Sequence, residues 1–147
     1  MKNCPLCSAA GGVLVAQTSH YRLIRADDAS HPIFYRLIWQ SHVAEFSDLS
    51  VPERLLCMEA VATVEQVLRQ QLPPDLRPTK INLASLGNVV PHLHWHIIAR
   101  YDWDNHYPDP VWATARRAPD AQQLQALQAQ LPALDAALQA ALAALAA

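Results

Sequence analysis

The stretch PHLHWHII, residues 91–98, decides how this chain folds and what chemistry it carries. Histidines recur in it at strict two-residue spacing, separated by large apolar residues. Because successive side chains of a strand point to opposite faces, this pattern predicts a strand with three imidazoles in a row on one face and apolar residues on the other. The alternative interpretation is a solvated or weakly metal-binding histidine face.

Length and composition predict a single domain over residues 1–147. The formal net charge is −2 and the charged residues are spread along the chain, so neither a nucleic acid polymer nor an anionic membrane is an expected partner. The amino terminus lacks the apolar run of a secretory signal, and Pro132 and Asp135 in the alanine-rich tail suit a packed helix better than a membrane span. We therefore expect a cytoplasmic protein.

Periodicity predicts five strands and two helical regions. The strands are expected at residues 13–17, 21–26, 33–40 and 80–86 and from residue 89 onward. A long amphipathic helix should follow Ser50, which forms a capping box with Glu53, and should end near Gln71. A helical extension is expected at about residues 119–147, interrupted at Pro132. The order predicts an α+β fold, an antiparallel five-stranded sheet with its helices on one side.

The cysteines favour a metal site over a disulfide framework. Two of the three cysteines form a Cys-x-x-Cys pair, Cys4 and Cys7, as expected in a reducing compartment. The glycines at 11–12 indicate a turn rather than the helix that a thioredoxin-like redox pair would need. With His42 and His92, the pair would supply the two thiolates and two imidazoles of a structural zinc site. Beyond possible zinc, no organic cofactor is expected.

The histidine row also has a catalytic interpretation. A neutral imidazole is a good nucleophile towards phosphorus, and a second group can orient it while a third assists the leaving group. His94 has a histidine on either side, so it is the natural nucleophile. The catalytic set would then be His94, His96 and His92, with His92 closest to the metal ligands.

The same residues resemble a known family. His92 to Ile98 resembles the His-φ-His-φ-His-φ-φ signature of the histidine triad (HIT) superfamily of nucleotide hydrolases and transferases. Ile38 to His42 is similar to the family's strand that ends in a histidine. Asn82 and Gly87-Asn88 precede the triad where the family carries phosphate and ribose contacts. The order of elements matches from about Cys4 to Arg100.

The resemblance implies a HIT-like fold, with the sheet extended across a homodimer. It implies a purine nucleotide or another nucleoside phosphate derivative as partner. His94 would attack the α-phosphorus to give a covalent nucleotidyl-histidine intermediate, resolved by water or another acceptor. His96 would lie beside the phosphate and the leaving group. The zinc ligands of metal-containing relatives match the set inferred above, Cys4, Cys7, His42 and His92.

Nucleotide contacts are also implied by the resemblance. Asn88 takes the place of a glutamine that donates to phosphate, Asn82 lies near a second ribose or phosphate contact, and Asp27 or Asp28 falls where the family has an acid near the ribose hydroxyls. Each has a structural alternative: the aspartates are common turn formers, and Asn82 could satisfy backbone groups at a bulge. Val89 replaces a serine or threonine whose hydroxyl contacts the leaving group.

These departures leave other functions open. Asn88 is shorter than glutamine and Val89 has no donor, which suits a nucleotide-binding regulatory protein with weak or no catalysis. A zinc-stabilised interaction module is a third possibility. Arg36 and Arg100 are potential phosphate partners, although a surface ion pair is the expected role of each. His20, His31 and His106 are expected in loops or on the surface.

Overall fold

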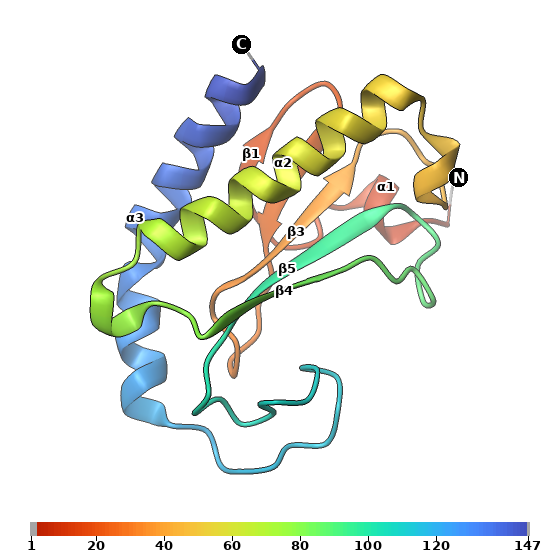
Figure 1. Ribbon diagram of the computed structural model, residues 1–147. Helices are drawn as coiled ribbons and strands as arrows, with labels where there is room; N and C mark the ends of the chain where they lie inside the picture. Colours follow the sequence, from red (N-terminus) through yellow and green to blue (C-terminus); the bar gives the residue numbers. More distant parts are fainter. Residues whose placement is uncertain (1–2, 147) are drawn as a thin grey trace.

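A five-stranded antiparallel sheet is the centre of the computed structural model, which describes residues 3–146 (Figure 1). Its strands are β1 (Val13–Gln17), β2 (Tyr21–Arg25), β3 (Phe34–Trp39), β4 (Lys80–Ala84) and β5 (His94–Arg100). They lie in the order β1-β2-β3-β5-β4, and all neighbouring pairs are antiparallel. The predicted α+β fold with a five-stranded antiparallel sheet is therefore confirmed.

Two long helices cover one face of this sheet (Figure 1). Helix α2 (Val51–Gln70) begins at the predicted capping box of Ser50 and Glu53 and packs against β5. Helix α3 (Ala121–Ala146) packs against β1 and α2. Two short 3₁₀ turns, η1 (Phe46–Asp48) and η2 (Pro74–Leu76), flank α2. Within residues 3–146 no helix is long and apolar enough to cross a membrane.

Helix α3 corrects one prediction, because it runs through Pro132 without a break. A proline inside a helix costs about 3 kcal/mol through its missing N–H and its steric clash. Leucines on both sides of it, Leu127, Leu134, Leu138 and Leu142, are buried in the main core. Each buried leucine contributes about 1.5–3 kcal/mol, so their burial together outweighs the proline. Tertiary packing thus holds the helix in one piece.

The pairing of β3 with β5 separates a packed face from a face that carries the histidines. His94 lies opposite Ile38 and His96 opposite Arg36, while Trp95 alternates with them and packs on the helix-covered core. The predicted histidine strand is nevertheless too long, because β5 begins only at His94. His92 precedes it, and its N–H bonds to the carbonyl of Val90 in a tight turn. The row on the strand therefore contains two histidines, with the third in the preceding turn.

A short helix, α1 (Pro5–Ser8), opens between the two cysteines, where the sequence predicted only a turn. Pro5 occupies a first-turn position, where its missing N–H is harmless. The buried guanidinium of Arg22 donates to the carbonyls of Leu6, Ala9 and Ala10 at the other end. These contacts give the cysteine segment a defined conformation against the sheet.

Candidate functional site

A cavity of about 340 Å³ lies over the histidine face of the sheet. The strands contribute Arg36, His94 and His96 to its wall. The remaining wall comes from the cysteine segment, from the connection between β4 and β5, and from the loop after β5, through Leu6, Leu86, Gly87, Asn88, Val89, Val90 and Trp112. Segments distant in sequence thus enclose the two strand histidines.

The hydrogen bonding of His94 determines which of its nitrogens is available. Its Nδ1 lies 2.6 Å from the backbone carbonyl oxygen of His92. A carbonyl oxygen only accepts, so Nδ1 carries the proton and donates it. The lone pair of the neutral ring is then on Nε2. His94 lines the cavity although it is only 9% exposed.

His96 lies beside His94 with ring centroids 4.9 Å apart and is packed among aromatic rings. Phe34 and Trp112 meet its ring edge to face, at 5.6 Å and 5.1 Å. Burial lowers the pKa of His96 to about 4, and the electrostatic effects of nearby His94 and Arg36 act in the same direction. His96 is therefore neutral near pH 7 and offers a single N–H donor.

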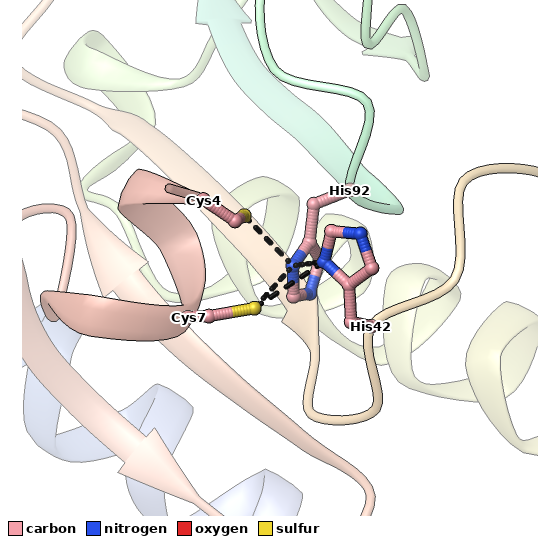
Figure 2. Close-up of side chains that lie close together, drawn as sticks. All are labelled: Cys4, Cys7, His42 and His92. Carbon is pink, nitrogen blue, oxygen red and sulfur yellow. Dashed lines mark hydrogen bonds between the residues drawn. The ribbon is translucent and has the colours of Figure 1, made fainter. Parts of the chain in front are cut away.

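Cys4, Cys7, His42 and His92 converge as the sequence predicted (Figure 2). The Nδ1 atoms of the two histidines are 3.3 Å apart, and the Cys7 sulfur lies 3.3 Å from His42 and 3.4 Å from His92. The Cys4 sulfur is 3.4 Å from His92 Nδ1. Zn–N bonds of about 2.0–2.1 Å and Zn–S bonds of about 2.3 Å in a tetrahedron separate ligand atoms by about 3.3–3.8 Å. The four side chains therefore fit zinc.

His92 connects this cluster to His94. Its Nε2 lies 2.7 Å from the carbonyl oxygen of Trp39, so Nε2 carries the proton and Nδ1 presents its lone pair to the cysteines. Such a second hydrogen bond is the usual way of fixing the orientation of a metal-ligating histidine. Its own carbonyl accepts the proton of His94. One residue thus contacts both cysteines through its ring and orients His94 through its carbonyl.

Of the four residues predicted to contact the nucleotide, only Asn88 lines the cavity. Asn88 and Val89 line it, and Val89 is 93% exposed with no polar group to offer. Asn82 lies on β4, where its Oδ1 accepts from Arg100 at 2.7 Å. Asp27 is exposed. Asp28 accepts hydrogen bonds from the backbone N–H groups of two residues in its own turn, which agrees with the alternative that it is an ordinary turn former. Neither aspartate lines the cavity.

Arg100 anchors the loop after β5. The prediction that Arg100 forms a surface ion pair is wrong. Arg100 is buried and makes two hydrogen bonds to the carboxylate of Asp104, at 2.8 Å and 3.1 Å, with a third to the carbonyl of Asp109. Burial would raise the pKa of Asp104, but the bonds from Arg100 and from backbone N–H groups hold it at about 2. This ion pair anchors the loop that places Trp112 against His96.

A second group of potential ligands surrounds the same carboxylate. His31, Asp104 and His106 lie within ligand distance of one another, and His31 is buried rather than on the surface as expected. Its Nδ1 is 3.3 Å from Asp28, and burial lowers its pKa. Since Arg100 already neutralises Asp104, we assign this group a structural role.

Arg36 and Trp112 are parts of the cavity whose position the sequence did not predict. Arg36 forms no ion pair with any residue between 3 and 146, so its expected surface ion pair is also wrong. The alternation of residues in β3 predicted that Arg36 lies on the face opposite the apolar one. It did not predict that Arg36 lies beside a histidine, as it does opposite His96. Trp112 comes from an irregular loop without periodicity, and no local signal in the sequence could have placed it there.

Comparison with known proteins agrees with this geometry. The family model described as HIT domain matches residues 10–103. The chain belongs to the HIT family. The matched segment contains the whole sheet of this HIT protein, whereas α3 lies outside it. A comparison with curated proteins gave no match.

Solved structures show the same fold. A histidine triad protein from Bradyrhizobium japonicum is 27% identical, with a TM-score of 0.65 over 84% of this HIT protein and 90% of the other chain. One from Marinobacter aquaeolei is 25% identical, with a TM-score of 0.65 over 85% and 89%. A Zn-bound histidine triad family protein from Mycobacterium smegmatis is 19% identical, with a TM-score of 0.57 over 92% and 98%.

Proposed function

We propose that this HIT protein is a nucleotide hydrolase or nucleotidyl transferase that acts at the α-phosphate through a covalent nucleotidyl-His94 intermediate. The observation that carries the proposal is the 2.6 Å hydrogen bond from His94 Nδ1 to the carbonyl of His92, in a residue that lines the cavity. This bond fixes the tautomer whose Nε2 can attack. It also stabilises the positive charge that the ring acquires when Nε2 forms a bond to phosphorus.

The reaction would proceed in two displacements. The Nε2 lone pair of His94 forms a bond to the α-phosphorus while the bond to the leaving group breaks, and the leaving group departs with that electron pair and takes up a proton. Neutral His96 donates its N–H to the phosphate. Water then attacks phosphorus and loses a proton, the N–P bond breaks, and a nucleoside monophosphate leaves. An acceptor other than water would make the protein a transferase.

The first prediction concerns the nucleophile. His94→Ala should abolish release of AMP from an adenosine phosphoramidate or a dinucleoside polyphosphate, with a loss of at least about 10³-fold because no other group can form the intermediate. Mass spectrometry of quenched wild-type protein should find the adduct on His94. His20→Ala, an exposed histidine away from the cavity, is the control. Unchanged turnover by His94→Ala would refute the mechanism, and tight nucleotide binding without turnover in wild type would favour the regulatory alternative, which Val89 and Asn88 motivate.

We further propose that Cys4, Cys7, His42 and His92 hold a structural zinc ion. Its two thiolate and two imidazole ligands leave no open position, so it would supply folding energy and no catalytic water. The distances among the four ligand atoms support this, and the Mycobacterium smegmatis protein of the same fold is Zn-bound. Bound zinc would also fix His92, whose carbonyl holds His94.

The second prediction tests this metal. Purified protein should contain about one zinc per chain, and Cys4→Ser should lose it, because removing one thiolate breaks the tetrahedral set. A chelator should lower the Tm of wild type and leave that of Cys4→Ser unchanged. Cys57→Ser, at the buried thiol of α2, is the control and should retain zinc. Wild-type protein that carries no zinc after metal reconstitution would refute the assignment.

The partner of the chain is, we propose, a second copy that extends the sheet across a homodimer. Strand β4 lies at the edge of the sheet and pairs only with β5 among the described strands. Its Leu83, and Leu86 just beyond it, are 42% and 53% exposed. An unpaired edge beside apolar side chains is suited to strand pairing with another chain.

A further inference from the structure

Among residues 3–146, the cavity has one fully charged side chain, Arg36, and no carboxylate. Arg36 is the cross-strand partner of His96, so the two share one face of the sheet, with Cβ atoms about 4.5–5.5 Å apart. The corresponding partner of His94 is Ile38, which is apolar and fully buried. The positive charge therefore lies at the His96 end of the cavity.

This charge forms no ion pair with a carboxylate in the described part of the chain. The guanidinium of Arg36 stands 5.3 Å from the Phe34 ring centre, and its buried Nε has no hydrogen-bond partner between residues 3 and 146. By contrast, Arg25 and Arg100 are each paired with an aspartate. Burial lowers the pKa of Arg36, against the opposing charge of Asp28, yet a guanidinium stays protonated. A half-buried charge without a partner is unfavourable unless a ligand pairs with it.

We propose that Arg36 binds a second anionic group of the substrate, beside the phosphate that His94 attacks. The substrate class would then be nucleotides with a phosphoric anhydride chain, in preference to phosphoramidates whose leaving group is a neutral amine. The planar guanidinium fork matches the oxygens of a phosphate group. Val89, also in the wall, cannot donate to a leaving group, so Arg36 is the charged donor available there. This inference rests on the proposed function.

The test compares two substrates in three variants. Arg36→Leu should lower kcat/KM for a dinucleoside polyphosphate by about 10–100-fold, because one charge-assisted hydrogen bond is lost. It should change kcat/KM for an adenosine phosphoramidate by less than about threefold. Arg36→Lys should restore part of the loss, since it keeps the charge without the fork. Arg69→Leu, at an exposed arginine of α2, is the matched control and should change neither.

Two results would overturn the inference while leaving the role of His94 intact. An equal loss on both substrates would mean that Arg36 holds the reacting phosphate, and no loss on either would mean that it binds no substrate. Thermal unfolding tests whether Arg36→Leu is correctly folded. Its Tm should be at least that of wild type, since the substitution removes a charge that has no ion-pair partner among residues 3–146.

Binding tests Arg36 independently of turnover. Wild type should bind ADP more tightly than AMP by calorimetry, and Arg36→Leu should lose that preference. Equal wild-type affinity for the two nucleotides would count against the second anionic site, whatever turnover is found. A preference for ADP with no turnover of any substrate would contradict the catalytic proposal alone.

Discussion

At the residue scale, a few hydrogen bonds determine what each histidine can do. His92 uses its ring for the cysteine cluster and its carbonyl for His94, whereas His96 is buried among aromatic rings. Three histidines at regular spacing in the sequence therefore have three different environments. Their hydrogen-bonding roles follow from these contacts rather than from residue type.

The third prediction concerns His96 and pH. Its folded pKa of about 4 lies below the ordinary value of 6.5, so the unfolded chain binds this proton more readily between these two pH values. The free energy of unfolding should therefore fall as pH decreases from about 6.5 to 4, by about 3 kcal/mol from this group, and should keep its full contribution above 6.5.

Urea unfolding of wild type and His96→Asn from pH 4 to 7.5 measures this contribution. The variant should show a smaller decrease in stability than wild type over that range, and the difference between the two isolates His96 from other buried histidines. His20→Asn, which alters an exposed imidazole, should behave like wild type. Parallel pH profiles for wild type and His96→Asn would contradict the shifted pKa.

At the element scale, helix α2 shows how local signals and packing combine. Ser50 donates its backbone N–H and its hydroxyl to the same carboxylate oxygen of Glu53, at 2.8 Å and 2.6 Å. The helix then buries one face through Cys57, Val61, Val64 and Leu68. The capping box determines where α2 begins, and the buried face determines how α2 packs against β5.

The fourth prediction is that Ser50→Ala lowers the free energy of unfolding by about 1 kcal/mol, because the backbone N–H of Glu53 loses its side-chain acceptor and the Glu53 carboxylate loses the hydroxyl donor. Chemical denaturation at pH 7 measures the change. Ser47→Ala replaces a nearby exposed serine of η1 and should alter stability by less than about 0.5 kcal/mol. Equal effects of the two substitutions would show that the box contributes nothing.

At the scale of the whole molecule, the C-terminal region is part of the fold around the sheet. Helix α3 lies beyond the residues that match the HIT domain, yet its leucines enter the same core as the sheet. Asp135 on this helix accepts from Tyr35 at 2.7 Å and pairs with Arg25, which links α3 to β2 and β3. The edge strand β4, at the opposite side of the sheet from β1, pairs with β5 alone among the described strands.

The fifth prediction addresses that partner. Leu83→Lys should convert a dimer into monomers in analytical ultracentrifugation, because it places like charges at a shared edge. The far-ultraviolet circular dichroism should not change, since Leu83 is partly exposed. Val13→Lys makes the same substitution at a similarly exposed residue of the other edge strand and should leave the dimer intact. A wild-type protein that sediments as a monomer at micromolar concentration would refute the homodimer.

Local patterns in the sequence were sufficient to predict most of the helices and strands. The order of these elements along the chain was sufficient to predict the α+β class. Residue patterns predicted a strand in each of the five places where one lies, although the histidine strand begins at His94 rather than at residue 89, and a capping box located the start of α2. The chemistry of two cysteines and two histidines was enough to predict one ligand cluster, which Figure 2 shows assembled. Errors arose where packing overrides local preference: α3 continues through Pro132, and α1 forms between the cysteines.

The sequence by itself determined the approximate positions of the strands, the start of α2 at its capping box, and the residue types able to bind metal or attack phosphorus, because these depend on spacing within a few residues. Only the tertiary structure decided that Arg36 lies beside His96 with no ion-pair partner among residues 3–146, that Arg100 is buried with Asp104, and that Trp112 lines the cavity against His96. These facts depend on strand register and on loops packed across the sheet, and such long-range contacts leave no local pattern.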